Sequence, residues 1–172
     1  MQDPGPASAL IGMGANLGDA AATLRSALNG LARLPGCRLL RASGLWSSAP
    51  LDADGPEYCN AVAELHSELA PLELLDRLQQ LEQLHGRVRP PGVRNAPRTL
   101  DLDLLCFGDA RIDLARLSLP HPRMHERAFV LAPLAELHPD WQLPDGEPIA
   151  AAVQRLRAAG QQVRRLGALT AR

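Results

Sequence analysis

The stretch Leu100-Asp101-Leu102-Asp103-Leu104-Leu105-Cys106-Phe107 decides how this chain folds, because its first residues alternate between apolar and acidic side chains. Successive side chains of a β-strand point to opposite faces of the sheet. A strand over residues 100–107 therefore places Asp101 and Asp103 on one face and the intervening leucines on the other. This pattern predicts a strand whose leucines join the core while its carboxylates remain available to a polar site.

Hydrophobic periodicity and helix-capping signals predict the elements around this strand. Asp19 is a candidate N-cap for a helix that ends at Pro35-Gly36, and Pro71 begins a helix that Gly86 stops. The other predicted elements are strands over residues 9–13, 37–47, 59–68 and 162–166, helices over 127–137 and 148–158, a loop over 49–57 and a turn over 120–124.

The order of the early elements is β-α-β-β-α-β, which is the split βαβ arrangement of ferredoxin-like folds. We therefore expect an α+β fold in which helices pack on an antiparallel sheet. The length of 172 residues suits one domain, so we expect residues 1–172 to form it, with residues 1–7 as a flexible tail.

All 18 basic residues of the chain are arginines, and 13 of them follow residue 86. Base composition of the genome is an ordinary explanation for the missing lysines. Their absence nevertheless excludes a P-loop lysine and a Schiff-base lysine. Any phosphate must be held by arginine side chains, which suit two-point contacts with phosphate oxygens. The net charge of −1 does not favour binding of a polyanion by the chain as a whole.

The three cysteines, Cys37, Cys59 and Cys106, are widely spaced, and their number is odd. This spacing indicates neither a zinc site nor a disulfide framework, so we expect free thiols in a reducing compartment. The sequence shows no basic leader and no apolar run of the roughly 20 residues that a membrane span needs. We therefore expect a cytoplasmic protein with no membrane partner.

Residues 87–98 combine four arginines with three prolines and a glycine, which favours a mobile basic loop. One arginine just after a helix could simply complement the helix C-terminus. Four in such a short stretch instead suggest a lid that closes over a phosphate-containing substrate. The D-x-D pattern of Asp101 and Asp103 is by itself compatible with a half-exposed strand. Beside an arginine loop, it favours carboxylates that hold Mg²⁺ for phosphoryl transfer.

Two weaker patterns suggest an aromatic binding site. Tyr58 and Asn60 share a strand face, so a ring that stacks and an amide that pairs could meet a flat heterocycle together. A tyrosine at the edge of the core and an asparagine in a turn are the alternative explanation. Phe129, at the start of a late helix, could likewise be an ordinary core residue.

Two further patterns do not indicate the site that they resemble. The spacing of His121 and His125 does not favour zinc, because Pro122 interrupts the segment, and His121 could instead donate to a phosphate. The run Gly12, Gly14 and Gly18 lacks the third glycine position of a dinucleotide fingerprint, and a tight turn into the first helix explains it better.

In four blocks the chain resembles the 6-hydroxymethyl-7,8-dihydropterin pyrophosphokinases of folate biosynthesis. The blocks are Gly14-Ala15-Asn16-Leu17-Gly18, Tyr58-Cys59-Asn60-Ala61, Gly86-Arg87-Val88-Arg89 with Pro97-Arg98-Thr99-Leu100-Asp101-Leu102-Asp103, and Leu119-Pro120-His121 with Arg127 and Phe129. The resemblance implies a ferredoxin-like kinase that transfers pyrophosphate from ATP to the pterin alcohol and leaves AMP.

The resemblance also implies a role for each matching residue. It assigns two Mg²⁺ ions to Asp101 and Asp103, and stabilisation of the transferring phosphates to Arg87 and Arg98. The residues that it implies for ATP are Gln79, Glu82, Arg89, Arg116, Ser118, His121 and Arg127. Those that it implies for the pterin are Ser48, Leu51, Tyr58, Asn60 and Phe129, with the two aromatic rings on either side of the substrate. Family members often carry a tryptophan in the lid where this chain has Asn95-Ala96.

The partners that follow are ATP and a pterin alcohol, with no nucleic acid, and we expect a monomer. A non-catalytic ferredoxin-like module that binds a nucleotide or RNA is the alternative. RNA readers of this architecture use several exposed aromatic residues, whereas aromatic residues make up only 3% of this chain. The sequence therefore favours the enzyme.

Overall fold

The computed structural model describes residues 5–50, 55–86 and 99–171. Its elements in chain order are β1 (Ala7–Ala15), α1 (Ala20–Ala32), β2 (Cys37–Ala42), β3 (Leu45–Ser48), β4 (Tyr58–Ser67), α2 (Pro71–Leu84), β5 (Asp101–Phe107), β6 (Ile112–Asp113), β7 (Ser118–Leu119), the 3₁₀ helix η1 (Met124–Glu126), α3 (Ala128–Leu137), α4 (Ile149–Ala158) and β8 (Val163–Gly167). Apart from the short hairpin β6–β7, these elements follow the predicted order.

The main sheet is antiparallel and runs in the order β5-β1-β4-β3-β8, with β2 also paired to β4. If β2 and β3 are counted as one interrupted strand, the first four positions have the ferredoxin-like order, and β8 extends the sheet beyond them. The α+β fold with an antiparallel sheet is therefore confirmed.

The single strand predicted over residues 37–47 is wrong, because the chain breaks between β2 and β3 at Ser43. The Ser43 side chain accepts a hydrogen bond of 2.9 Å from the backbone N–H of Val62. A hydroxyl group thus takes the place of a backbone carbonyl in the ladder, and the strand divides into β2 and β3, which pair with the two ends of β4.

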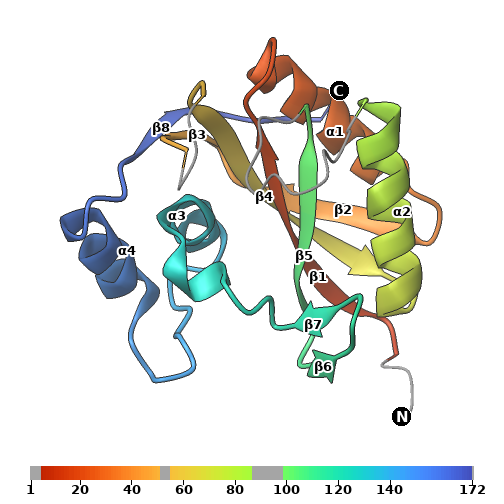
Figure 1. Cartoon of the computed structure of the whole chain (residues 1–172). Coiled ribbons are helices and arrows are strands. Elements are labelled where there is room, and N and C mark those ends of the chain that lie inside the picture. Colours follow the sequence, from red (N-terminus) through yellow and green to blue (C-terminus); the bar gives the residue numbers. More distant parts are fainter. Residues whose placement is uncertain (1–4, 51–54, 87–98, 172) are drawn as a thin grey trace.

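The two faces of the sheet are covered differently (Figure 1). Helices α1 and α2 lie on one face, whereas α3 lies on the other and α4 packs outside α3. The buried stripe of α1 includes Leu24, Leu28 and Leu31, and that of α2 includes Leu74 and Leu78. Because α3 is covered on both sides, most of its residues are buried, and Glu136 is its one charged residue.

The helix limits follow the predicted capping residues. The Asp19 side chain accepts a hydrogen bond of 3.0 Å from the backbone N–H of Ala22 and so caps α1. Pro71 is the first residue of α2, and Gly86, with φ of 76°, follows its end. None of the helices in the described parts of the chain has the length and apolar character needed to cross a bilayer.

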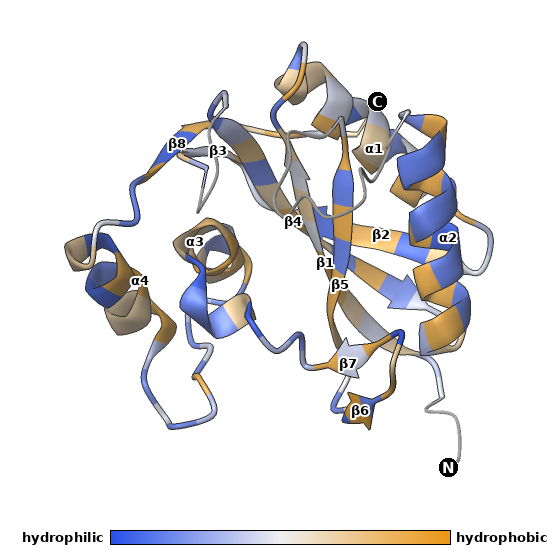
Figure 2. Cartoon of the chain, in the orientation of Figure 1, coloured by the Kyte–Doolittle hydropathy of each residue, from blue (hydrophilic) through white to orange (hydrophobic). Residues whose placement is uncertain are grey.

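The alternation predicted for β5 holds as far as Leu104 and then shifts at an irregularity in its pairing with β1. Leu100, Leu102 and Leu104 are buried with α1 and α2, as predicted. Beyond the irregularity, Leu105 and Cys106 are buried on the α3 side. Figure 2 shows the alternating hydrophilic and hydrophobic bands along β5.

Candidate active site

A pocket of about 440 Å³ lies between strands β1, β4 and β5 and the start of α3. Its volume is within the range of small-molecule sites. The residues that line it come from β1, β3, β4, β5, the β7–α3 connection and the first turn of α3. They are Gly12, Met13, Gly14, Ser48, Ala49, Tyr58, Asn60, Ala61, Asp101, Asp103, His121, Pro122, Arg123, Arg127, Phe129 and Val130.

The floor of the pocket is open because β1 places glycines there. Gly14 pairs with Asn60 of β4 on one side and with Asp101 of β5 on the other, and Gly12 pairs with Asp103. A methyl group on Gly14 would lie 3.4 Å from Oδ1 of Asn60. The strand predicted over residues 9–13 contains Gly12, as observed, but the turn predicted after it is wrong at Gly14, because β1 continues to Ala15. Gly18, with φ of 60°, is the turn residue.

Asp101 and Asp103 project from the same face of β5 into the pocket, as their spacing predicts. Their carboxylates are oxygen donors, and Mg²⁺ usually takes one or two protein carboxylates and leaves its other positions to water and phosphate. The donor set therefore fits Mg²⁺. In the described ranges, this site included, no group of three or more His, Cys, Asp and Glu side chains is placed to hold a metal.

The opposite side of the pocket floor carries Tyr58, Asn60 and Ser48. Nδ2 of Asn60 donates a 2.7 Å hydrogen bond to the Ser48 hydroxyl, and both residues are buried. This bond fixes the orientation of the amide plane, because β3 and β4 hold the two residues on adjacent strands. The shared face predicted for Tyr58 and Asn60 is confirmed.

His121 enters the pocket from the connection after β7, which contains a cis peptide bond before Pro120. Its backbone N–H donates to the carbonyl of Leu105 at 2.8 Å, and its Nδ1 accepts from the backbone N–H of Arg123 at 3.2 Å. Burial lowers the pKa of His121, the positive charges of Arg127 and Arg123 lower it further, and Asp101 opposes them. The neutral ring, with Nδ1 as acceptor, carries its proton on Nε2.

Arg127 and Phe129 flank the first residue of α3 and line the pocket together. The guanidinium carbon of Arg127 lies 5.6 Å from the centroid of the Phe129 ring, within the range of a cation–π contact. Arg123 is also at the pocket, and the sequence interpretation missed it. Its position in the predicted turn beside His121 was the one available signal.

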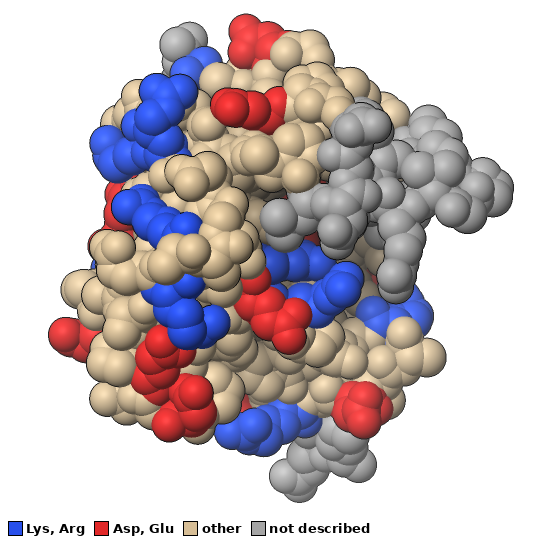
Figure 3. All heavy atoms as spheres, turned by 60° about the vertical axis from the view of Figure 1, so that its left-hand side comes forward, with Lys and Arg blue, Asp and Glu red and all other residues tan. Residues whose placement is uncertain are grey.

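Acidic and basic residues line the same pocket. In the space-filling view, blue and red side chains adjoin near the middle of the face shown (Figure 3). In the pocket, the acidic groups come from β5 and the basic groups come from the segment of residues 121–130. This arrangement can hold a cation and an anionic ligand side by side.

Four of the predicted nucleotide residues, Gln79, Glu82, Arg116 and Ser118, do not line this pocket but belong to the neighbouring elements α2 and β7 and the segment before β7. Nη2 of Arg116 lies 2.5 Å from Oδ1 of Asp76 and 3.5 Å from Oε1 of Gln79. Buried Glu82 accepts a 3.0 Å hydrogen bond from the backbone N–H of Leu102, so it contacts β5 between the two aspartates. The remaining predicted site residues, Leu51, Arg87, Arg89 and Arg98, lie outside the described residues, as does the whole predicted lid.

Comparison with known proteins gives a consistent family. A family model described as 7,8-dihydro-6-hydroxymethylpterin-pyrophosphokinase (HPPK) matches residues 10–139. A 2-amino-4-hydroxy-6-hydroxymethyldihydropteridine pyrophosphokinase of Pseudomonas aeruginosa is 50% identical over 137 residues, which cover 79% of this chain and 83% of the relative. The enzyme of the same name from Haemophilus influenzae is 42% identical over 149 residues, which cover 86% of this chain and 92% of the relative.

Solved structures agree at the level of the fold. A crystal structure of HPPK-DHPS in complex with substrates has a TM-score of 0.71 at 12% identity, with 91% of this chain and 44% of that chain covered. Wild-type Plasmodium falciparum HPPK-DHPS with pterin and p-hydroxybenzoate has a TM-score of 0.69 at 14% identity, with coverages of 92% and 45%. This chain thus spans less than half the length of those chains, and the likeness shows a shared fold.

Proposed function

The chain belongs to the 7,8-dihydro-6-hydroxymethylpterin-pyrophosphokinase family, and we propose that the pocket between β5, β4 and the start of α3 is its catalytic site. The protein is an ATP-dependent pyrophosphokinase of folate biosynthesis that transfers pyrophosphate from ATP to 6-hydroxymethyl-7,8-dihydropterin. One observation carries the assignment of the site: paired carboxylates, an aromatic-and-amide pair, and a basic segment line the same pocket.

The pterin occupies the part of the pocket between Tyr58 and Phe129. Two aromatic rings can stack on a flat heterocycle, and the amide of Asn60, oriented by Ser48, can pair with its edge. Support comes from the open floor at Gly14, which leaves room for a ring beside Asn60. The backbone of Leu51 completes this subsite in the proposal.

The triphosphate lies on the basic side of the pocket. His121 donates from Nε2 and Arg127 supplies a fixed positive charge, so both favour phosphate oxygens. The nucleoside extends past β5 toward α2 and β7, where the proposal places Gln79, Glu82, Arg116 and Ser118. Support for this placement is the contact between Arg116 and Gln79. Arg89 is the remaining ATP residue of the proposal.

Asp101 and Asp103 hold the metal in this proposal, which involves two Mg²⁺ ions. When bound, Mg²⁺ neutralises charge on the phosphates and orients them. The pterin hydroxymethyl oxygen attacks the β-phosphorus in line, the bond from that phosphorus to the oxygen shared with the α-phosphate breaks, and AMP leaves. The hydroxyl proton passes to solvent. Arg87 and Arg98 stabilise charge on the transferring group, so the protein acts by positioning and electrostatics.

The direct test is AMP formation by the purified chain with ATP and MgCl₂, with and without the pterin alcohol. We expect AMP and the pterin diphosphate in equal amounts, and no AMP above background when the pterin alcohol is omitted. AMP formation that does not depend on the pterin would overturn the proposed site, as would release of ADP in place of AMP.

We further propose that the enzyme is a single-domain cytoplasmic monomer. Edge strand β8 exposes Arg164 and Arg165, and like charges on an edge strand oppose pairing with a second sheet. Cys37, Cys59 and Cys106 are free thiols, which suits a reducing compartment. Light scattering coupled to size exclusion would test the oligomeric state: a mass twice that of the 18.5 kDa chain would contradict the monomer.

A further inference from the structure

The first backbone N–H group of α3 needs a hydrogen-bond acceptor that the helix itself does not provide. Arg127 is the N-cap residue, and its side chain makes no capping hydrogen bond. The first backbone N–H groups of a helix have no partner within the helix. Ala128, the first residue of α3, is fully buried, so water cannot easily satisfy its N–H group.

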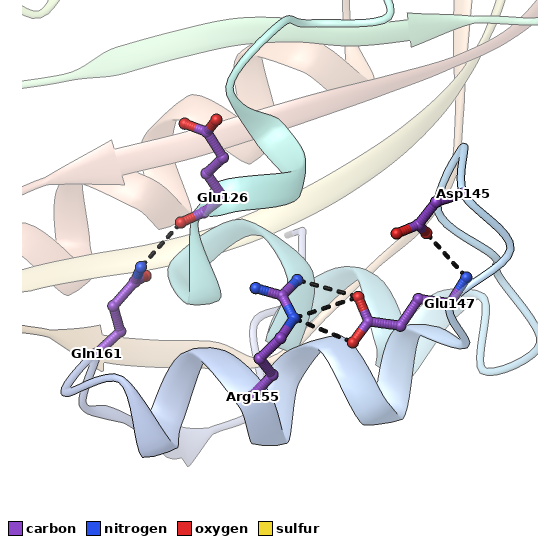
Figure 4. Close-up of polar contacts among 5 residues, drawn as sticks. All are labelled: Glu126, Asp145, Glu147, Arg155 and Gln161. Carbon is purple, nitrogen blue, oxygen red and sulfur yellow. Dashed lines mark hydrogen bonds and ion pairs between the residues drawn. The ribbon is translucent and has the colours of Figure 1, made fainter.

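The carboxamide of Gln161 supplies that acceptor from a distant part of the chain. Figure 4 shows the other contact of the same side chain, with Glu126. Its Oε1 accepts a 2.8 Å hydrogen bond from the backbone N–H of Ala128. Its Nε2 donates a 2.8 Å hydrogen bond to the backbone carbonyl of Glu126. One side chain therefore holds the backbone on both sides of Arg127, at the junction between η1 and α3.

Gln161 is itself held firmly by the end of α4. The N–H of Gln161 donates to the carbonyl of Leu156 at 3.0 Å, and the N–H of Gly160 donates to that of Arg157 at 3.0 Å. These two bonds form a Schellman motif, which needs the positive φ of 103° that Gly160 adopts. Since Leu156 packs in the same buried cluster as α3, the carboxamide is presented to α3 at a fixed position.

We propose that Gln161 is a positioning residue, which fixes Arg127 and Phe129 at the pocket by clamping the backbone between Glu126 and Ala128. This inference rests on the proposed function, because it assigns both residues to substrate binding. Gln161 lies beyond residue 139, where the family match ends. The clamp needs a group that donates and accepts at the same time, and an uncharged amide is such a group.

The kinetic test compares Gln161→Ala with the control variant Gln162→Ala. Gln162 is the next residue in the chain, and its side chain is exposed. Because a hydrogen bond to a buried group is lost, we expect Gln161→Ala to raise the KM for the pterin about tenfold. The value of kcat should remain within about threefold of wild type, because the clamp does not touch Asp101 or Asp103. We expect Gln162→Ala to match the wild type, and Gln161→Glu, which keeps only the acceptor, to fall between wild type and Gln161→Ala.

Two kinetic results would overturn the inference. One is an unchanged KM in Gln161→Ala. The other is a lower kcat with an unchanged KM, which is what a smaller folded fraction produces when Gln161 merely stabilises the fold.

Amide hydrogen exchange tests the clamp without relying on activity. In Gln161→Ala we expect faster exchange at Ala128 and at neighbouring amides of α3, with no change in the amides of β1 and β4. Uniformly faster exchange, or wild-type exchange at Ala128, would overturn the clamp. If the wild-type chain produces no AMP in the assay above, the proposed function fails, whereas the exchange result still decides whether Gln161 holds this segment.

Discussion

The two walls of the pocket are built in different ways. One wall is the sheet, where Asp101 and Asp103 of β5 and Tyr58 and Asn60 of β4 flank the glycines of β1. The other is the segment of residues 121–130, which passes from a turn through η1 into α3. The sheet wall is held by continuous ladders of backbone hydrogen bonds, whereas the segment wall is held by packing of buried residues such as Met124 and by a few hydrogen bonds to distant residues.

This difference bears on how each wall responds to substitution. Removing a side chain from the sheet wall leaves the backbone in place, so the loss reports the chemistry of that side chain. The segment wall is attached through single contacts, such as His121 N–H to Leu105 and Ala128 N–H to Gln161. We therefore expect loss of one such contact to affect several pocket residues together. The predictions below test this contrast.

The largest effect is expected at the sheet wall from Asp103→Asn. This change keeps the size of the side chain but removes the charge that holds Mg²⁺, so kcat should fall roughly 10²- to 10³-fold, as for other losses of preorganised electrostatic groups. Steady-state AMP formation at saturating ATP and Mg²⁺ measures it. Exposed Asp109, just after the same strand, offers the matched control Asp109→Asn, which we expect to be fully active. Wild-type turnover in Asp103→Asn would refute the metal assignment.

Gly14→Ala tests the open floor between the two halves of the sheet wall. The added methyl group would lie 3.4 Å from Oδ1 of Asn60, which Ser48 already holds in place. That distance is an ordinary contact, so the free protein can accept the methyl group, which would instead occupy the space beside Asn60 that the proposal gives to the pterin. If the pterin loses about 1–3 kcal/mol of binding free energy, its KM should rise roughly 5- to 150-fold.

The comparison variant for that experiment is Gly12→Ala. Its methyl group would meet the buried apolar side chain of Leu105 at 3.4 Å and not the amide of Asn60. We expect a smaller rise in KM, measured in the same assay. Equal effects of the two variants would show that Asn60 is not the group that limits the space.

Glu82→Ala tests how β5 is held at its outer edge. It removes the acceptor for the buried N–H of Leu102, and an unsatisfied buried donor costs about 1–3 kcal/mol. The free energy of unfolding in urea should therefore decrease by about that amount. Glu82→Gln retains an acceptor oxygen, so its free energy of unfolding should decrease less than that of Glu82→Ala. Equal stability of Glu82→Ala and the wild type would mean that the contact with Leu102 does not support the strand.

His121 should make stability depend on pH in a predictable direction. Burial lowers its pKa from the ordinary value of 6.5, so the unfolded chain binds a proton more readily than the folded protein. The contribution to stability is full above pH 6.5 and is lost as the pH falls through the lower folded pKa. His121→Gln should therefore show a shallower loss of stability below pH 6.5 in urea titrations. Parallel curves for the variant and the wild type would contradict this.

The smallest effect is expected from Arg155→Ala. Arg155 of α4 forms an exposed two-point ion pair with Glu147, which precedes this helix, and the C-terminal end of α4 presents Gln161 (Figure 4). Exposed pairs contribute little, and this pair does not contact the start of α3. We expect no measurable change in KM or kcat. A rise in KM like that of Gln161→Ala would show that any disturbance of α4 reaches the pocket.

Much of the sheet wall could be predicted because its signal is local. A spacing of two residues places Asp101 with Asp103, and Tyr58 with Asn60, wherever a strand forms. The same reasoning failed at Ser43, where a side-chain hydroxyl enters the ladder and divides one predicted strand into β2 and β3. It also failed at Gly14, because a glycine in a turn and a glycine that opens a pocket look alike in sequence.

By itself, the sequence determined the order of the elements, the helix limits at Asp19 and Pro71, and the faces of β5, because backbone geometry imposes periods of two and 3.6 residues on any chain. Tertiary structure alone decided that Arg123 lines the same pocket as the aspartates, that Glu82 supports β5, and that Gln161 holds the start of α3. Those contacts join residues far apart in the chain. They depend on how the helices close over the sheet, and no local period encodes that packing.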